Sequence, residues 1–336
     1  MNETTPLVAA AGSGWVAAAT SSQLDDGPVA ATVLGVDLVI ARLGDAVVAL
    51  HDRCAHRGAP LSGGDVRIAP NGRHCLVCPY HGLHYGADGS AVHLPARPDA
   101  RLARRLDLRT LPVEERHGLV WTSLVAEPEG QPPDFSAFDG PRLLRFQLEP
   151  ERWEAAPGRI VENFNDLAHF PFVHADTFGD ASHPDVGDIE VLVDGDTIRH
   201  GILMHQLDRL TLDGAPVPIE VAYSYVHSAP FATELRIRFD DDRTEWIQMT
   251  LTPIDDDRAL VFQQNARNFD LDDDVGAYAK FQHAVNTEDR LLLERLTPRR
   301  VRPDGADLDE VALAVDGFTI AYRRWWAQRL HPEGAR

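Results

Sequence analysis

The 336-residue chain has three cysteines, one lysine and no long apolar run. All three cysteines lie between residues 54 and 78, so no disulfide framework is available elsewhere, as is usual for a protein of a reducing compartment. The single lysine leaves arginine to carry nearly all positive charge, from which we draw no function. Residues 1–19 lack the basic start of a signal peptide, and no segment reaches the roughly 18 apolar residues of a membrane helix. We therefore expect a cytoplasmic protein.

Other absences limit the chemistry that the chain performs alone. It has no G-x-G-x-x-G after a strand, no P-loop and no cysteine set for a second iron–sulfur cluster of the ferredoxin type. Basic residues are outnumbered, 32 against 52 acidic ones, which gives a net charge of −20. Such a surface disfavours nucleic acids and anionic membranes, and it suits a basic redox partner. The hydrophobic fraction of 44% and the length fit a globular protein of two domains.

Two short motifs in the first third of the chain pair a cysteine with a histidine. Cys54-x-His56 is followed 21 residues later by Cys78-x2-His81. A [2Fe-2S] cluster with two cysteines on one iron and two histidines on the other needs this set of ligands. With Arg-Gly-Ala-Pro-Leu after the first pair and Gly-Leu after the second, the stretch resembles the cluster motif of the Rieske non-haem iron oxygenases.

Alternatives for these residues are weighed against that resemblance. Structural zinc also takes two cysteines and two histidines, but it usually presents Cys-x2-4-Cys and His-x3-5-His pairs rather than mixed Cys–His pairs, although Cys75-x2-Cys78 gives one such pair here. Cys75 is expected to be a buried spare thiol. Respiratory Rieske proteins add a disulfide between the two cluster loops, and the corresponding positions here resemble Ala59 and Tyr80, which excludes it.

The pattern of apolar runs predicts a β-rich fold. Short runs at residues 15–19, 30–34, 36–42, 46–50, 111–114 and 117–121, with a hairpin at 85–92, predict a small antiparallel domain. Further strands are expected at 189–193, 197–202, 219–226, 232–239, 244–251 and 259–266, and a last amphipathic helix at 308–330 with Trp325 and Trp326 against the sheet. A Pro-, Gly- and Asp-rich stretch predicts a linker at 127–141 between domains 1–126 and 142–336.

A second candidate metal motif follows the predicted linker. Asp166 and His169 are three residues apart and would share a helical face. His169 and His174 are five apart, which on a regular helix would separate them by about 140°, so Pro171 is expected to break the helix and bring both imidazoles to one metal. Two histidines and a carboxylate form the facial triad of non-haem Fe(II) oxygenases. Taken alone, a His-x4-His pair is a weak signal, and the upstream cluster motif strengthens it.

The segment from Glu162 to His174 also resembles the mononuclear iron motif of the same oxygenases, Glu/Asp-x3-Asp-x2-His-x4-His. The resemblance extends to residues 288–294, which match their Glu-Asp-x4-Glu segment and imply Asp289 as third iron ligand, with Glu288 as the alternative. Glu294 is expected to stabilise the helix or a neighbouring arginine. By the same alignment Asn163 lies near the iron, although an Asn at a helix start is more often a cap.

The resemblance implies a role for Asp166 as well. In the family this aspartate bridges a cluster histidine of a neighbouring subunit, here His81, to an iron ligand, here His169. A homotrimer then places one chain's cluster against the next chain's iron, since the two centres of one chain are usually too far apart for rapid electron transfer. The alternative is that Asp166 only orients His169.

These features predict an α+β chain, with an all-β Rieske [2Fe-2S] domain followed by a helix-grip (START-like) antiparallel-sheet catalytic domain. The resemblance implies a cytoplasmic terminal oxygenase, most similar to the dicamba and vanillate O-demethylases, that takes electrons from NAD(P)H through a reductase and a ferredoxin. It would hydroxylate or O-demethylate a small aromatic substrate with O2. A ring-hydroxylating dioxygenase forming cis-diols is the alternative within enzymes, and an electron-transfer or zinc-binding protein is the alternative outside them.

Overall fold

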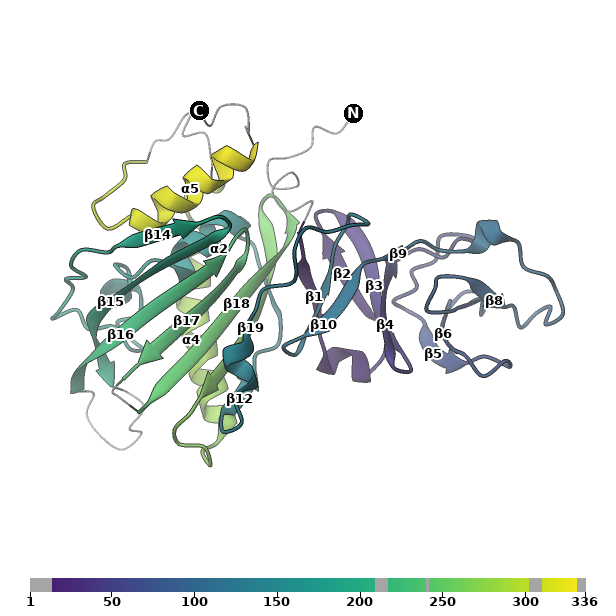
Figure 1. Ribbon diagram of the computed structural model, residues 1–336, viewed down its shortest axis with the longest axis horizontal. Helices are drawn as coiled ribbons and strands as arrows, with labels where there is room; N and C mark the ends of the chain where they lie inside the picture. Colours follow the sequence, from purple (N-terminus) through teal and green to yellow (C-terminus); the bar gives the residue numbers. More distant parts are fainter. Residues whose placement is uncertain (1–13, 209–216, 240–241, 302–309, 331–336) are drawn as a thin grey trace. The chain divides into compact units, whose positions relative to one another are not determined.

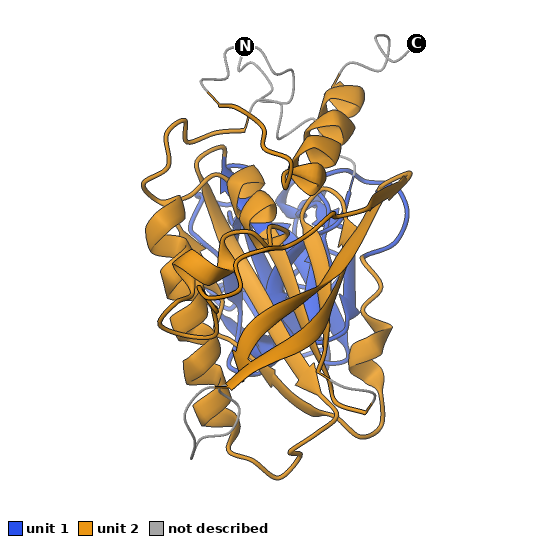
Figure 2. Ribbon diagram, turned by 90° about the vertical axis from the view of Figure 1, so that its left-hand side faces the viewer, with its two compact units in different colours: residues 1–132, 252–255 blue, residues 133–251, 256–336 orange. Residues whose placement is uncertain are grey.

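The computed structural model describes residues 14–208, 217–239, 242–301 and 310–330, which form two compact units. The first contains residues 1–132 and 252–255, and the second contains residues 133–251 and 256–336 (Figure 2). The break after residue 132 falls inside the stretch 127–141, whose bounds as a linker remain a prediction. Within the described residues, no helix combines the length and the hydropathy that a membrane span requires.

The first unit is built from short antiparallel strands, as the apolar runs predict. Its strands are β1 Val16–Thr20, β2 Val29–Val33, β3 Val36–Leu43, β4 Ala46–His51, β5 Asp65–Ile68, β6 His74–Val77, β7 His84–Tyr85, β8 Ala91–His93, β9 Thr110–Leu111, β10 Val113–Arg116 and β11 Leu119–Thr122, with 3-10 turns η1 Ser22–Asp25 and η2 Arg104–Leu106. They pair in the orders β1-β11-β10, β2-β3-β4-β9 and β5-β6-β7-β8. The small sheet from β5 to β8 carries one of the two cluster motifs in its β6–β7 connection, and the other follows β4.

The second unit is dominated by one eight-stranded antiparallel sheet (Figure 1). Its strands are β12 Leu144–Gln147, β13 Glu151–Trp153, β14 Val191–Asp194, β15 Thr197–Asp208, β16 Val217–Ser228, β17 Ala232–Arg238, β18 Thr244–Asp255 and β19 Arg258–Arg267. They run in the order β12-β19-β18-β17-β16-β15-β14, and β13 pairs with β19. Alternate residues of the long central strands, such as Tyr223, Tyr225, Leu235 and Ile237, are buried, so one face of the sheet forms a core.

In the part of the second unit that the structure describes, the α-helices are α2 Pro157–Phe164, α3 Phe170–Val173, α4 Val275–Leu293 and α5 Gly317–Leu330, with a 3-10 turn η3 Ser136–Asp139. Helix α2 begins with a proline at its first position, where no backbone donor is lost. The N-terminus of α4 is capped by Asp274, whose side chain accepts a hydrogen bond from the Gly276 N–H at 2.9 Å. Figure 1 shows α2 and α4 on one face of the sheet and α5 beside β14 and β15.

The last helix is shorter than the sequence pattern predicts. Residues 310–316 are not helical, and the predicted residues 308 and 309 lie outside the described residues. Leu313 N–H instead donates to the Asp316 carboxylate at 2.7 Å in a turn that precedes Gly317. The prediction of a helix from 308 was therefore wrong at its start, because local side-chain hydrogen bonding competes with helix formation. Trp325 and Trp326 are buried, as expected.

A buried ion network joins α2 to α5. Glu162 accepts hydrogen bonds from Arg159 at 3.1 Å and from Arg323 at 2.5 and 3.0 Å, and its side chain is only 9% exposed. Glu310 pairs with the same two arginines. Burial raises the pKa of Glu162, against the opposing effect of the arginine partners. Since α2 leads directly into the candidate metal residues, this network fixes the start of the segment that carries them.

We predict that Glu162→Gln destabilises the protein by about 3–5 kcal/mol, because it leaves two buried arginine charges without their main counter-charge. Denaturant unfolding measures the loss. The matched control is Glu154→Gln, which weakens the exposed pair with Arg152 and should change stability by less than about 1 kcal/mol. Equal effects of the two substitutions would show that the network adds nothing to stability.

Candidate metal centres and substrate pocket

Two turns of the first unit hold the cluster candidates in the same way. In the first, the Cys54 N–H donates to the Ala59 carbonyl at 2.8 Å, and the Gly58 N–H donates back to the Cys54 carbonyl at 2.8 Å. The turn after β6 repeats both bonds around Cys78, at 2.9 and 3.0 Å. The fourth residue after each cysteine is a glycine with a positive φ, 73° and 67°, a conformation that a side chain would strain. The repeated geometry presents each cysteine and its histidine in the same manner.

Thiols and imidazoles occupy different environments at these turns. Cys54 and Cys78 are each 2% exposed, and burial raises the pKa of Cys78, with the neighbouring Cys54 thiol adding to the effect. His56 and His81 are exposed, and their ring centroids lie 4.6 Å apart. A buried thiol pair beside an exposed imidazole pair fits a cluster with cysteines on an inner iron and histidines on an outer one.

Cys75 does not complete a zinc knuckle with these residues. It lies on β6, next to Leu76, whose side chain packs with Cys54 and Cys78 on one face of the strand. Since neighbouring strand residues face opposite ways, the Cys75 thiol points elsewhere, and it donates to the Arg73 carbonyl at 3.5 Å. Cys75 is a buried free thiol, as expected.

Tyr85 contacts the first cluster turn, which the sequence did not predict. Its hydroxyl accepts a hydrogen bond from the Ala55 N–H at 3.2 Å and lies 3.2 Å from Cys54 Sγ. Because the hydroxyl oxygen already accepts a bond from the Ala55 amide, the O–H group is available to donate to Cys54 Sγ. The only sequence signal was an aromatic residue in a predicted hairpin, which does not distinguish this role from packing.

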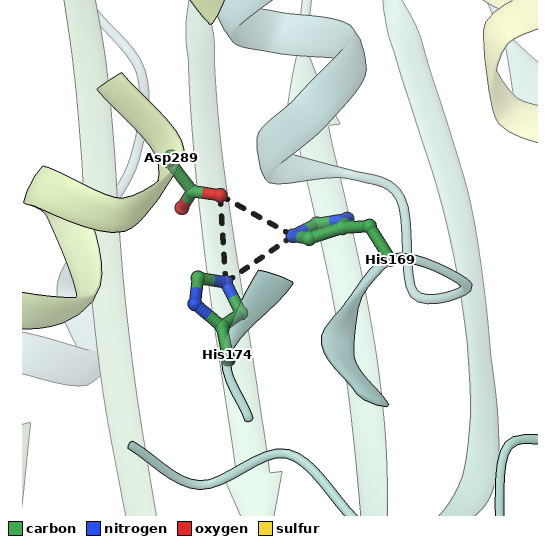
Figure 3. Close-up of side chains that lie close together, drawn as sticks. All are labelled: His169, His174 and Asp289. Carbon is green, nitrogen blue, oxygen red and sulfur yellow. Dashed lines mark hydrogen bonds and ion pairs between the residues drawn. The ribbon is translucent and has the colours of Figure 1, made fainter. Parts of the chain in front are cut away.

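Three donor atoms in the second unit converge on one point (Figure 3). His169 Nε2 and His174 Nε2 are 3.2 Å apart, and each is 3.4 Å from Asp289 Oδ1. A point equidistant from three atoms so spaced is about 1.9 Å from each, close to the ~2.0–2.2 Å of metal bonds to imidazole nitrogen and carboxylate oxygen. The histidines come from either side of α3, and Asp289 comes from α4.

Neighbouring groups turn the three donor atoms toward that point. His169 Nδ1 donates to Asp166 Oδ2 at 2.9 Å, and His174 Nδ1 donates to Glu288 Oε2 at 2.8 Å. Both Nε2 atoms therefore face the Asp289 carboxylate and are the nitrogens left to bind a cation. Donor atoms at such distances need a shared cation between them, which is a proton in the metal-free protein, and their spacing fits a metal ion.

Further bonds hold the carboxylates themselves. Asn163 Nδ2 donates to Asp289 Oδ1 at 3.1 Å, and Thr177 Oγ1 donates to Glu288 Oε2 at 2.8 Å. Asn163 thus lies beside the site, in the last turn of α2 and not at a helix start. Glu288 binds the far nitrogen of His174 and lies outside the convergence point. Glu294 accepts a bond from the Glu154 N–H at 3.2 Å, a contact that the sequence did not suggest.

The prediction that Asp166 and His169 share a helical face was wrong. Helix α2 ends at Phe164, and residues 165–169 form a turn before the four-residue α3. Asp166 Oδ1 accepts from the Ala168 N–H at 3.0 Å, which stabilises this turn in place of a helix. His169 and His174 flank α3 as its two caps, with Pro171 in its first turn. Their proximity thus comes from a single short helix between two non-helical segments.

The electrostatics of the site differ between the two histidines. Burial lowers the pKa of His169, but the hydrogen bonds to Asp166 and Asp289 prevail and raise it to about 9. Burial lowers the pKa of His174 below its usual range, against the charges of Asp289 and Glu288. For Asp166, burial raises the pKa, but the bond from His169 outweighs it and the net shift is downward. The Asp166 carboxylate therefore remains charged at neutral pH beside His169.

A pocket opens onto the three converging residues. Its lining includes the rings of Phe164, Phe170, Phe178, Tyr223, Tyr225 and Phe281. These come from α2, α3, α4 and β16 and from the loop after α3, so elements distant in sequence make one aromatic cavity. Such a lining favours a flat, mostly apolar molecule held next to the metal position.

Two family models match the chain. Residues 14–112 match the Rieske [2Fe-2S] domain, and residues 153–331 match the vanillate O-demethylase oxygenase C-terminal domain. The first match contains both cluster turns, and the second contains the whole convergent site.

Several characterised proteins and solved structures resemble most of the chain. Methylxanthine N1-demethylase of Pseudomonas putida is 32% identical over 92% of this chain and 85% of its own length. The oxygenase component of dicamba O-demethylase from Stenotrophomonas maltophilia is 30% identical over 90% of this chain and 94% of its own. The structure of P. putida NdmA with caffeine aligns with a TM-score of 0.81 at 30% identity, covering 96% of this chain and 92% of that one.

We predict that Glu288→Ala weakens Fe(II) binding about 10–100-fold, because His174 loses the acceptor that orients its ring. Equilibrium metal titration against a competing chelator measures the change. Glu288→Gln, which keeps an acceptor oxygen, should lose less, and Glu294→Gln should lose nothing. Unchanged affinity in the alanine variant would show that Glu288 does not orient the ligand.

We predict that Tyr85→Phe lowers the reduction potential of the cluster. A hydrogen bond to a cysteine sulfur draws electron density from the cluster and favours its reduced form, so losing the bond favours the oxidised form. Redox titration of the cluster absorbance measures the shift. A potential equal to that of the wild type would show that the hydroxyl does not donate to Cys54.

Proposed function

This chain belongs to the Rieske oxygenases that carry the vanillate O-demethylase C-terminal domain, and on that premise we propose that it demethylates a small methylated aromatic compound. It is the terminal oxygenase component of a multicomponent monooxygenase system. The observation that carries the proposal is the convergence of His169, His174 and Asp289 beside an aromatic pocket, in a chain that also carries a Rieske domain.

The relatives favour transfer of one oxygen atom. The two described above are a methylxanthine N-demethylase and a dicamba O-demethylase, and a third is a putative toluene-4-sulfonate monooxygenase subunit. This pattern favours oxidative removal of a methyl group or hydroxylation over cis-dihydroxylation. The proposal therefore covers both N- and O-methyl groups, whereas the family resemblance in the sequence suggested hydroxylation or O-demethylation.

In the proposed assignment, Cys54, His56, Cys78 and His81 hold the [2Fe-2S] cluster, and His169, His174 and Asp289 hold the mononuclear iron. When bound, these groups supply single electrons and activate O2. The chain's own residues prepare the site. Asp166 and Glu288 keep the Nδ1 protons of the two histidines in place, and the aromatic lining excludes water and orients the substrate's ring.

Electron-transfer partners are implied by the multicomponent systems to which such oxygenases belong. We propose that these partners are a ferredoxin and an NAD(P)H-dependent reductase. The net charge of −20 on this chain favours a partner with a basic docking surface. We propose a homotrimer and a cytoplasmic location, the latter in keeping with three cysteines that form no disulfide.

Asp166 is proposed as the bridge between one chain's His169 and the neighbouring chain's His81. Its Oδ2 is bonded to His169, and 32% of its side chain is exposed, against 12% for His169. That exposure leaves an edge of the carboxylate available to a second chain. The prediction is that Asp166→Asn slows reoxidation of the reduced cluster by about 10–100-fold while both metals remain bound.

Rapid mixing of the chemically reduced variant with substrate and O2, together with iron analysis, tests this bridge. The matched control is Asp65→Asn, which alters an exposed carboxylate on β5. Loss of mononuclear iron in Asp166→Asn would instead assign Asp166 to orienting His169. Reoxidation at the wild-type rate would remove it from the electron path.

A single-turnover assay tests the proposed reaction. Reduced, iron-loaded protein is exposed to O2 with N-methylated heterocycles, methoxylated aromatics and unsubstituted aromatics, and products are identified by mass spectrometry. We expect loss of a methyl group with release of formaldehyde, or gain of one oxygen atom. A product that gains two oxygen atoms as a cis-diol would contradict the monooxygenase assignment.

A further inference from the structure

The substrate pocket has one polar wall, built from α4 and the sheet. Asp289, Asn286 and Gln282 are spaced three and four residues apart, so they lie along one face of α4. Asn286 Nδ2 donates to Gln263 Oε1 at 2.7 Å, and Gln282 Nε2 donates to Asn286 Oδ1 at 3.2 Å. These side chains are buried, so their hydrogen bonds fix the amide orientations.

Glu245 of β18 ends this network at the pocket. Its Oε1 accepts a long hydrogen bond of 3.4 Å from Asn265 Nδ2. The same nitrogen also donates to Gln282 Oε1 at 3.4 Å. Gln263 Nε2 donates to Asn265 Oδ1 at 3.0 Å, so the side-chain amides of this wall hydrogen-bond to one another. Within the described residues, the other carboxyl oxygen of Glu245 has no hydrogen-bond partner. A pocket-lining carboxyl group with one oxygen free is available to a bound molecule.

The surroundings of Glu245 favour its neutral form. Burial raises its pKa to about 7, although the bond from Asn265 and the positive charge of Arg267 oppose this shift. Arg267 itself is held over the Tyr278 ring, at 3.5 Å from its centroid, and donates to the Asp270 carbonyl. Tyr223 lies on β16, which β17 separates from the strand of Glu245, and burial raises the pKa of its phenol, with the charge of Glu245 adding to the effect. Below about pH 7 the carboxyl group therefore carries a proton that it can donate.

The charge of the lining excludes one class of substrate. No lysine or arginine is among the pocket-lining residues of the described chain, and the two histidines there point their free nitrogens at the metal position. In this lining a substrate carboxylate would lose its hydration with no lysine or arginine beside it, and above about pH 7 it would also meet an ionised Glu245. An uncharged acceptor, such as a carbonyl oxygen or a ring nitrogen, would instead complete the hydrogen bonding of a protonated carboxyl.

We propose that Glu245 is a specificity-determining residue that donates a hydrogen bond to a carbonyl oxygen or ring nitrogen of an uncharged aromatic substrate and disfavours aromatic carboxylates. This inference rests on the proposed function, since it names the substrate class of the same pocket. It divides the candidate substrates by charge, a distinction that the aromatic lining does not make.

The test compares two probes of similar shape that differ in charge, 4-methoxy-N,N-dimethylbenzamide, whose amide has no N–H and can only accept, and 4-methoxybenzoate. Binding to the iron-loaded, oxidised protein is measured by calorimetry without reductant, at pH 6 and pH 8.5. We expect the amide to bind at least about 10-fold more tightly than the benzoate at pH 6. Its affinity should fall at pH 8.5, because a group whose pKa is about 7 has then lost the proton that it donates.

Variants separate Glu245 from other causes of a pH effect. Glu245→Gln carries an amide that donates at both pH values, so the affinity for 4-methoxy-N,N-dimethylbenzamide should become independent of pH. Glu245→Ala should lose the preference for the amide. Glu220→Gln, which changes an exposed carboxylate on β16, should behave as the wild type. Iron content and the cluster spectrum confirm that each variant is folded.

Three results would overturn the proposal. The first is that the amide binds no better than the benzoate, which includes the case in which neither binds. The second is a pH dependence of binding that persists in Glu245→Gln. The third is tighter binding of 4-methoxybenzylamine at the higher pH, which would make Glu245 a cation site. Because binding is measured without turnover, its outcome is separate from that of the proposed reaction. A protein that binds as expected but forms no product would contradict only the proposed function.

Discussion

The second unit depends on holding three electron-rich atoms within 3.4 Å of one another. Without a cation these atoms repel, so the protein must restrain each of them. It does so with a carboxylate behind each imidazole and an amide donor on Asp289. Because these supporting groups are partly or wholly buried, they hold the two Nε2 atoms and Asp289 close together. This arrangement costs free energy, which a bound metal offsets.

The fold supplies this restraint from segments far apart in sequence. The turn after α2 carries Asp166 and His169, and α4, more than a hundred residues later, carries Asp289. Helix α2 is tied to α5 by the buried network around Glu162, while α4 presents its polar stripe toward the sheet. The same stripe passes from the metal position at Asp289 to the amides beside Glu245, so metal binding and substrate selection share one helix face.

Chemistry that depends on residue type and local spacing could be read from the sequence. The two Cys–His motifs and the long strands with alternating buried residues were identified because local patterns carry them. His169 and His174 were identified from their spacing together with the family resemblance, and Asp289 from the resemblance alone. The helix predicted from residue 308 and the helical face shared by Asp166 and His169 were wrong, because side-chain bonds from Asp316 and Asp166 replaced helical ones. The roles of Tyr85, Glu288 and Glu245 were not predictable, since each arises from a partner brought close only by folding.

The most direct measurement is the iron content and cluster spectrum of Asp289→Ala beside the wild type after anaerobic loading with iron. If His169, His174 and Asp289 hold an iron separate from the cluster, the wild type binds about three irons per chain and the variant about two, with the Rieske spectrum unchanged. An unchanged iron content, or loss of the cluster spectrum with the third iron retained, would contradict the account.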